Sequence, residues 1–509
     1  MSSDTLQDRQ WTELSEFIAR TLGLHFPPNR WADLQRGVAG ATSELGFMDA
    51  TACVEWISSA RLTQPQLRML ASHLTVGETY FFREKRTFEV LADSVLPELI
   101  FSRRNRDQRL RIWSAACSTG EEAYSLAIML HQVIPDLADW RATILATDIN
   151  DTFLKRAVAG IYGEWSFRGT PESFKERYFT STEDGRYSVL PEIKKIVTFA
   201  ALNLVEDPFP SLAASTNAID VVFCRNVLMY FTPPQAQKVV NKLHRALADG
   251  GWLVLSPSEC SQSFASGFTQ VNFPGAILYQ KREGKDGAFR NEPLFPIQNS
   301  GSVAFNSPLL KASQLRVDLD ASESMEPSTA ASAGQVDQVA APRSPRDEAA
   351  TLFERGQYAD AAEILQGILD SVTAPASDSF SLLARALANQ GKLDDSLQWC
   401  DRWVATDKLD SSSHYLRAVV LQELGDIAEA QRSLQRAIYL DPQFVLAHFS
   451  LGNLARGCGK LSEAKRYFNN ASRLLGAFQP DELLPESDGL TASRLAEIIK
   501  SIIDMEAAP

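Results

Sequence analysis

Residues 110–127 read Leu-Arg-Ile-Trp-Ser-Ala-Ala-Cys-Ser-Thr-Gly-Glu-Glu-Ala-Tyr-Ser-Leu-Ala, and this stretch decides the fold class. Its first seven residues predict a short buried strand, and residues 121–133 predict a helix. The turn between them consists of small residues, which lets a ligand approach the backbone at a helix N-terminus. One glycine is weak evidence for a dinucleotide site, which usually has three. No Lys-Ser or Lys-Thr follows it, as a phosphate loop requires.

Strands and helices continue to alternate after this stretch. Further strands are predicted at 142–147, 219–224 and 252–256, and further helices at 151–159 and 234–247. This alternation favours an α/β domain with a parallel or mixed sheet covered on both faces. Residues 172–204 interrupt the rhythm, and there the segments 186–190 and 195–199 predict a small antiparallel β insertion.

Asp148 ends the second predicted strand. An acidic residue at this position commonly accepts hydrogen bonds from ribose hydroxyl groups. Its alternative role is the N-cap of the next helix, although Asp151 would fill that role better. Together with the small-residue turn, Asp148 suggests a nucleoside-containing ligand that lacks a pyrophosphate.

Both ends of the chain are predicted to be helical. Residues 1–100 form an all-α N-terminal domain, in which Trp11, Leu14 and Ile18 recur at helical spacing. From residue 345 the chain repeats itself, since Gly356, Gly391, Gly425 and Gly459 lie 35, 34 and 34 residues apart. This period resembles the tetratricopeptide repeat, a helix-turn-helix unit of 34 residues. Such an array offers a concave surface to a protein or peptide partner, or else serves as a structural or dimerising element.

The predicted domains are the helical N-terminal domain (1–100), the α/β domain (101–282, with its β-subdomain at about 172–204), a largely disordered linker (283–344), the repeats (345–477) and a C-terminal helix or tail (478–509). The linker is assigned from its composition, because 321–346 contains no aromatic residue. We expect residues 345–509 to be removable without loss of ligand binding in the remaining fragment.

Composition and charge exclude several classes of protein. The 509 residues are 45% hydrophobic and 22% charged, which is ordinary for globular domains. The net charge is −13, and neither half has the basic excess of a nucleic-acid-binding protein. Arginines cluster at 103–111, as a solvated loop or helix end or as a patch for an acidic partner. The six cysteines and six histidines lack zinc spacing, so we predict no metal site, reduced thiols and a cytoplasmic protein.

Several motifs resemble those of the chemoreceptor glutamate methyltransferases of the CheR family, and they occur along the chain in the family's order. They are Thr75-Val-Gly-Glu-Thr-Tyr-Phe-Phe-Arg83-Glu, Ala115-Ala-Cys-Ser-Thr-Gly-Glu-Glu-Ala-Tyr-Ser, Ala146-Thr-Asp-Ile, Asn203-Leu, Val222-Phe-Cys-Arg-Asn-Val-Leu-Met-Tyr230-Phe and Ser256-Pro-Ser-Glu259. The likeness covers roughly residues 11–282, and the added repeats resemble tandem forms of the family, including those of Wsp-type pathways. Two departures are Gly77, where many members have Asn, and Ala123, where Pro is common.

The resemblance implies a fold, a cofactor and a site. The fold would be a helical domain on an S-adenosylmethionine-dependent methyltransferase domain with a small β insertion. The residues that would contact S-adenosylmethionine are Thr79, Arg83, Glu122, Asp148, Asn203, Leu204, Arg225 and Asn226. Arg83 and Tyr230 would lie near the transferred methyl group as the catalytic residues.

The implied activity is O-methylation of glutamate side chains on a methyl-accepting, chemoreceptor-like protein. The enzyme would be recruited to membrane receptor clusters, with a protein or peptide partner at its repeats and no nucleic-acid partner. The alternatives are a catalytically silent scaffold and methyl transfer to a small molecule. Arg83 could instead pair with Glu84, and Tyr230 could be a packed aromatic residue. Tyr80, Phe81 and Phe82 could shield adenine, although core packing is their more ordinary role.

Overall fold

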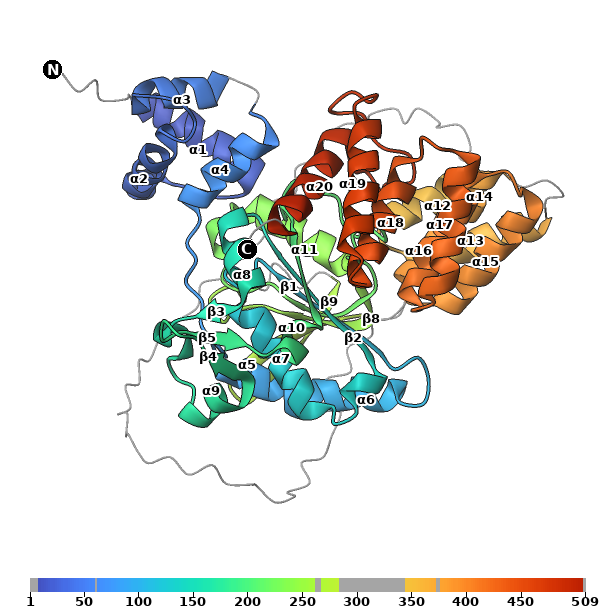
Figure 1. The fold of residues 1–509 in the computed structure, drawn as a ribbon, viewed down its shortest axis with the longest axis horizontal. Coiled ribbons are helices and arrows are strands. Elements are labelled where there is room, and N and C mark those ends of the chain that lie inside the picture. The colour runs from blue at the N-terminus through green and yellow to red at the C-terminus, as the bar shows by residue number, and fades with distance from the viewer. Residues whose placement is uncertain (1–7, 60–61, 261–266, 283–343, 372–375, 507–509) are drawn as a thin grey trace, which may run out of the picture. The chain divides into compact units, whose positions relative to one another are not determined.

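The computed structural model describes residues 8–59, 62–260, 267–282, 344–371 and 376–506 (Figure 1). The predicted linker at 283–344 lies outside these residues except for Ser344, which caps the first helix of the repeats. Among the helices described, none is long and apolar enough to cross a membrane.

The N-terminal domain is all-α, as predicted. Its helices are α1 (Asp8–Leu22), α2 (Trp31–Thr42), α3 (Ala50–Ser59) and α4 (Gln64–Leu74). The apolar face predicted from helical spacing is the buried one, because Trp11, Leu14 and Ile18 all lie in the core of this domain. Leu34 of α2 and Val54 of α3 complete the same cluster.

The central domain contains a mixed sheet of seven strands in the order β6-β2-β1-β7-β8-β10-β9. The first five strands of this order run parallel to one another, whereas β10 is antiparallel to both β8 and β9. The strands are β1 (Arg109–Ala115), β2 (Arg141–Asp148), β6 (Val197–Ala201), β7 (Ile219–Phe223), β8 (Leu247–Val254), β9 (Phe268–Phe273) and β10 (Ala276–Lys281). The sequence predicts a parallel or a mixed sheet, and the structure has the mixed one.

Helices alternate with these strands. The helices of the domain are α5 (Lys85–Val90), α6 (Leu96–Arg103), α7 (Glu121–Val133), α8 (Asp151–Ala159), α9 (Glu172–Tyr178), α10 (Pro191–Lys194) and α11 (Pro233–Ala246). The predicted boundary at residue 100 would place α5 and α6 in the N-terminal domain, but their Phe88 and Leu96 pack in the same apolar core as Ile112 of β1. Both β1 and β7 are buried along their whole length, as expected for central strands of a covered sheet. Their charged residues Arg109, Arg111 and Asp220 are buried in ion pairs.

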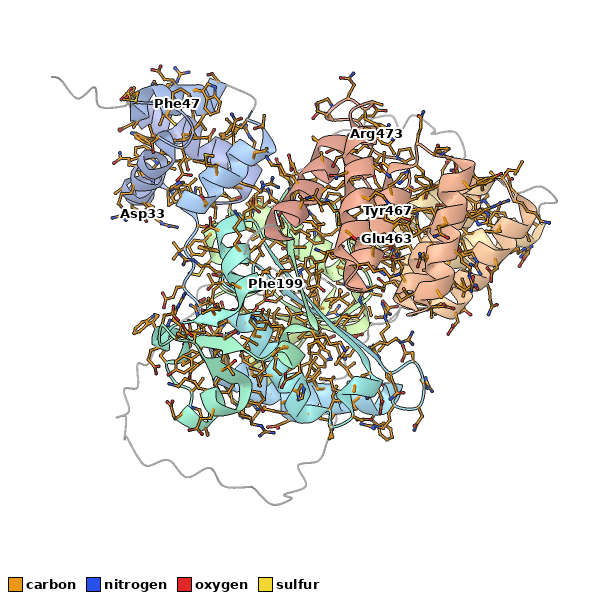
Figure 2. All side chains as sticks on the ribbon, viewed as in Figure 1. Asp33, Phe47, Phe199, Glu463, Tyr467 and Arg473 are labelled. Carbon is orange, nitrogen blue, oxygen red and sulfur yellow. The ribbon has the colours of Figure 1, made fainter. Side chains whose placement is uncertain are left out.

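The small antiparallel insertion is present, but one of the two segments assigned to it lies elsewhere. The insertion consists of β3 (Ile161–Tyr162), β4 (Phe179–Ser181) and β5 (Tyr187–Val189) in the order β3-β5-β4. The segment predicted at 195–199 instead contributes to β6, which pairs in parallel with β2 at the edge of the main sheet. Its Phe199 packs against Tyr124 of α7 with ring centroids 5.6 Å apart, and Figure 2 shows Phe199 within the α/β domain.

The repeats consist of consecutive helix pairs. The helices are α12 (Pro345–Glu354), α13 (Tyr358–Ser371), α14 (Ser377–Asn389), α15 (Leu393–Thr406), α16 (Ser411–Glu423), α17 (Ile427–Leu440), α18 (Val445–Gly457), α19 (Leu461–Leu475) and the following α20 (Ala492–Glu506). Each periodic glycine joins the two helices of a pair at a φ angle of 74° to 82°. This left-handed region explains why glycine recurs there. Trp403, which departs from the repeat pattern, is buried and stacks on Phe380.

The arginine cluster at 103–111 pairs with acidic groups of the same chain. Arg103 pairs with Asp220, and Arg104 pairs with Asp136. Arg109 and Arg111 both contact Glu423 of α16, at 2.8 and 2.7 Å. The acidic partner of these last two arginines therefore lies in the repeats of this same protein. Removal of residues 345–509, which is predicted to leave a ligand-binding fragment, would leave Arg109 and Arg111 without this anion.

Candidate functional site

A cavity lies at the carboxyl ends of the parallel strands. The residues that follow β1, β2, β6 and β7 all contribute to its wall, and β1 marks the point where the strand order reverses. Open α/β sheets commonly bind ligands in this crevice. The residues singled out from the sequence all line this cavity: Thr79, Arg83, Glu122, Asp148, Asn203, Leu204, Arg225, Asn226 and Tyr230.

Asp148, at the end of β2, is held by backbone groups on both sides. Its Oδ2 accepts a hydrogen bond from the N–H of Ser118 at 2.8 Å, and its Oδ1 accepts one from the N–H of Asn150 at 2.9 Å. Burial raises the pKa of Asp148 to about 6, although these hydrogen bonds oppose the shift. The carboxylate is thus a fixed acceptor in the cavity wall.

The alternative role of Asp148 as a helix cap is filled by another residue. Asn150 caps α8, because its Oδ1 accepts hydrogen bonds from the N–H groups of Thr152 and Phe153. Asp151, which the sequence suggested for this role, pairs instead with Arg68 of α4 at 3.1 Å. Asp148 is therefore available to a ligand, and a ribose diol would suit its oxygens.

Arg225 ties three parts of the cavity wall together. Its side chain is 1% exposed, and its Nη1 lies 3.2 Å from Glu122. Its Nη2 donates to the backbone oxygen of Arg83 at 2.6 Å and lies 2.9 Å from Glu84. Burial raises the pKa of Glu122, and the charge of Arg225 opposes this shift. Arg225 thus fixes the turn that carries Arg83, so its main contacts are with the protein itself.

Arg83 does not form the ion pair with Glu84 that was considered as its alternative role. Its Nη1 donates to the backbone oxygen of Glu78 at 2.6 Å, while Glu84 pairs with Arg225. A guanidinium group has five N–H donors, and this contact uses one of them. Arg83 is partly exposed and lines the cavity.

Tyr230 lies where the N-terminal helices meet the cavity. The resemblance predicts that it lies near the transferred methyl group. It ends the turn Leu228–Tyr230, and its backbone oxygen accepts a hydrogen bond from the N–H of His25 at 2.7 Å. The guanidinium carbon of Arg30 lies 5.7 Å from the centre of its ring. His25, Phe26 and Arg30 line the cavity as well, and no motif marks them beyond the neighbouring Pro-Pro break.

Asn203 connects the same N-terminal helices to the loop after β6. Its Nδ2 donates to the backbone oxygen of Thr21 at 2.7 Å, and its Oδ1 accepts from the N–H of Val205 at 3.0 Å. The side chain is therefore used to shape the turn. Asn203 and Leu204 form the wall of the cavity on this side.

The aromatic run at 80–82 mostly serves packing. Phe81 is 1% exposed and contacts Phe167 and Phe179 of the small insertion, with ring centroids 5.0 and 5.1 Å away. Phe82 packs against Phe88 of α5. Of the three residues, Tyr80 lines the cavity, and the guanidinium carbon of Arg168 lies 3.9 Å from its ring centre.

Glu259, to which the sequence motifs assign no role, supports the turn that carries Asn226 and Val227 into the cavity wall. Its carboxylate accepts hydrogen bonds from the N–H groups of Asn226 and Val227, both at 2.7 Å, and from the hydroxyl of Ser256 at 2.5 Å. The residue is 5% exposed. The signal available was the motif Ser256–Glu259 after a buried strand, where an acid needs hydrogen-bond donors.

The residues of the cavity fit S-adenosylmethionine. The buried Oγ of Ser118 has no partner among the described residues, and Asp148 is suited to the ribose. Leu204 and Phe153 supply apolar wall for a base. Burial also raises the pKa of the Cys117 thiol well above its ordinary value, so this cysteine is not a thiolate nucleophile at neutral pH. In the part of the chain that the structure describes, no cluster of His, Cys, Asp or Glu could hold a metal ion.

Comparisons with known proteins agree with this geometry. Residues 77–277 match the family described as CheR methyltransferase, SAM binding domain. Residues 346–412 and 411–444 match tetratricopeptide repeats.

Three curated relatives share the catalytic part of the chain. Chemotaxis protein methyltransferase 1 of Pseudomonas aeruginosa is 38% identical over 42% of this chain and 77% of that protein. Chemotaxis protein methyltransferase Cher2 of Pseudomonas putida is 36% identical over 41% and 75%. The chemotaxis protein methyltransferase of Vibrio parahaemolyticus is 30% identical over 55% and 99%. The chain therefore belongs to the CheR methyltransferase family, with S-adenosylmethionine as its cofactor and tetratricopeptide repeats added after the catalytic domain.

Proposed function

We propose that this protein methylates the side-chain carboxylates of glutamate residues on a methyl-accepting, chemoreceptor-like protein. The observation that carries the proposal is that Arg83 and Tyr230 line the same cavity as Asp148. A group suited to a carboxylate and a group suited to a ribose thus face one space. The names of the relatives, all chemotaxis methyltransferases, support the same class of acceptor.

The proposed reaction requires no proton transfer by the protein. S-adenosylmethionine supplies a sulfonium methyl group that a nucleophile can take by direct displacement. A glutamate side chain has an ordinary pKa near 4.3, so at neutral pH it is already an anionic nucleophile. The protein therefore has to orient the acceptor and exclude water, and it needs no general base.

Arg83 is suited to orienting the acceptor. A guanidinium group can hold a carboxylate by two parallel N–H···O bonds, which fixes both the distance and the direction of the attacking oxygen. The backbone of Arg83 is fixed by Arg225, and its Nη1 is directed by Glu78. These contacts reduce the conformational freedom that the guanidinium loses when an acceptor binds.

Tyr230 lines the same cavity as Arg83. We propose that its hydroxyl lies at the reacting centre, where it can donate a hydrogen bond to the carboxylate. The backbone contact with His25 and the nearby Arg30 hold the residue between the two domains.

The repeats are proposed to bind a protein or peptide partner and to recruit the enzyme to membrane receptor clusters. Tetratricopeptide arrays act through protein contacts, and large apolar side chains are exposed along this one. Leu409 is 75% exposed and Tyr439 is 76% exposed.

A rival function is a catalytically silent scaffold that binds cofactor or receptor. Radiolabel transfer distinguishes the two. Purified enzyme and tritiated S-adenosylmethionine are incubated with membranes that contain a methyl-accepting receptor, and the label is then tested for release as methanol by alkali. We expect alkali-labile label on the receptor, which is the mark of a methyl ester.

Two controls make this experiment specific. A receptor whose acceptor glutamates are replaced by alanine should remain unlabelled, and the Asp148→Ala enzyme should label poorly. Absence of transfer by an enzyme that binds S-adenosylmethionine would favour the scaffold, and label confined to small molecules would favour a small-molecule acceptor.

A further inference from the structure

We propose that Arg494, on the helix that follows the repeats, is a positioning residue for the S-adenosylmethionine site. It acts through Asp207, which holds the turn of Asn203 and Leu204 in the cavity wall. The inference rests on the cofactor assignment and is independent of the identity of the methyl acceptor.

The repeats contact the catalytic domain at discrete points. The N–H of Leu212 donates to Asp488 at 3.2 Å, and Arg245 donates to the backbone oxygen of Glu354 at 2.9 Å. Between the sheet and the helices of the array lies a cavity of about 570 Å³, so the two surfaces are not closely packed throughout. Leu212 packs in the apolar core of the repeats, so the attachment combines apolar packing with charged contacts such as those of Arg109 and Arg111 with Glu423.

Arg494 makes the contact nearest to the cofactor site. Its side chain is 8% exposed, and its Nη2 donates to Asp207 Oδ2 at 2.6 Å and to the backbone oxygen of Ala201 at 3.2 Å. Its Nη1 pairs with Glu497 of the same helix at 3.1 Å. Arg494 thus reaches both the end of β6 and the turn that follows it.

Asp207 transmits this contact to the cavity wall. The same Oδ2 accepts a hydrogen bond from the backbone N–H of Asn203 at 2.7 Å, and the N–H of Asp207 donates to the oxygen of Asn203 at 2.9 Å. Asn203 and Leu204 line the cofactor cavity. Removal of Arg494 would leave Asp207, which is 9% exposed, without its guanidinium partner. The carboxylate would then turn toward water and release the Asn203 turn.

A second contact of α20 also supports elements that line the cofactor cavity. Glu497 lies 3.6 Å from Arg68 of α4, and Arg68 also pairs with Asp151 at the start of α8. Helix α20 therefore meets α4 and the turn after β6, and Arg68 of α4 links this contact to α8. These elements contribute Leu74, Phe153 and Asn203 to the cavity.

The test measures binding of S-adenosylhomocysteine by calorimetry, because this product of methyl transfer has no methyl group left to donate and needs no acceptor. Arg494→Met removes the charge at similar size, and Arg494→Lys keeps the charge without the fork. Arg473→Met is the matched control, since Arg473 is exposed on α19 (Figure 2). We expect a loss of affinity on the order of tenfold for Arg494→Met, a smaller loss for Arg494→Lys and none for Arg473→Met.

Further measurements separate positioning from general loss of structure. In a methyl-transfer assay, Arg494→Met should raise the KM for S-adenosylmethionine more than it lowers kcat. The double variant Arg494→Met/Asp207→Asn should lose less binding free energy for S-adenosylhomocysteine than the sum of the losses in the two single variants. The reason is that Asp207→Asn removes the carboxylate that Arg494→Met leaves unpaired.

The proposal is overturned if folded Arg494→Met binds S-adenosylhomocysteine like the wild type, or if the two losses add. If Arg494→Met does not fold, Arg494→Lys and Asp207→Asn decide: wild-type affinity in both rejects the role. If Arg494→Met lowers S-adenosylhomocysteine affinity as expected but the wild-type enzyme does not methylate glutamate, the proposed function is rejected and the role of Arg494 stands.

Discussion

The carboxylate of Glu259 accepts the backbone N–H of Asn226 at 2.7 Å and thereby fixes a turn in which Asn226 has a φ angle of 57°. This left-handed conformation is unfavourable for most residues, and it carries the chain from β7 toward Tyr230. Glu259 also accepts the N–H of Val227, so two strong charge-assisted bonds hold the turn.

Glu259→Gln should therefore impair both stability and turnover. An amide offers one acceptor oxygen instead of two and places an NH2 group against N–H donors. We expect the free energy of unfolding to fall by about 1–3 kcal/mol. Urea denaturation measures the stability. A lower kcat would show that Tyr230 is displaced. The control is Glu192→Gln on the exposed face of α10, which should behave like the wild type.

Asp148 should make cofactor binding depend on pH. Its pKa in the unliganded protein is about 6, and ribose hydroxyls donate hydrogen bonds to the ionised form. Affinity for S-adenosylhomocysteine should thus be constant above pH 7 and fall below pH 6, by up to about tenfold per pH unit. At pH 7.5, Asp148→Ala should weaken binding by about 10- to 100-fold. Calorimetry across this pH range measures both effects.

The same shift has the opposite consequence for folding. The folded-state pKa of Asp148 lies above its ordinary value of 3.8, so the unfolded chain ionises first. Stability therefore falls as pH rises from about 4 to 6. Asp148→Asn should remove this pH dependence of stability and weaken cofactor binding, although its NH2 group would face one of the two backbone N–H donors and so offset any gain in stability at pH 7. The exposed Asp139→Asn serves as the control, and an unchanged pH profile of binding in Asp148→Asn would contradict the assignment.

Tyr230→Phe should lower kcat more than cofactor affinity, because it removes one hydroxyl and leaves the ring in place. The ring keeps its contact with Arg30, and the backbone keeps its bond to His25. A loss on the order of tenfold or more is expected for a hydrogen bond made at the reacting centre. Tyr439→Phe, on an exposed face of the repeats, is the matched control. Wild-type turnover in Tyr230→Phe would show that Tyr230 is a packing residue.

Gly77 occupies a position where an added side chain would meet the ring of Phe153. A Cβ atom built there lies 2.6 Å from the ring, well below van der Waals contact. Gly77→Ala should therefore displace Phe153 and lower the free energy of unfolding by roughly 1–3 kcal/mol. Because Phe153 lines the cavity, cofactor affinity should fall too. Gly163→Ala meets no atom within 4 Å and should be neutral in both measurements.

Local chemistry made part of the fold predictable from the sequence. The strand-turn-helix at 110–133 follows from a buried apolar run, small turn residues and a helix start, all within one stretch. The repeats follow from glycines that adopt the same left-handed φ angle in each unit. Where the sequence repeats, one physical requirement is seen several times, and the inference becomes strong. The candidate site residues come from motifs, and they all line one cavity; their contacts with the cofactor and the acceptor stay predictions.

The partner of β6 could not be predicted in this way. A five-residue apolar segment can pair in either sheet, and nothing within residues 197–201 distinguishes the small insertion from the edge of the main sheet. The contact between Arg494 and Asp207 was also hidden, because 287 residues separate the two. A charged residue on a helix usually faces solvent, so its burial depends on a surface far away in the sequence.

The attachment of the repeats yields the last prediction, which concerns Glu423. Its carboxylate contacts Arg109 and Arg111, and all three side chains are at most 10% exposed. Burial lowers the pKa of Arg111 to about 10, with Glu423 opposing the shift, so the guanidinium stays charged at neutral pH. Glu423→Gln would leave two buried cations without their shared anion, at a cost of about 3–5 kcal/mol. Chemical denaturation should show this loss, whereas Glu363→Gln, exposed on α13, should not. A stability equal to that of the wild type would mean that water in the adjoining cavity solvates both guanidinium groups.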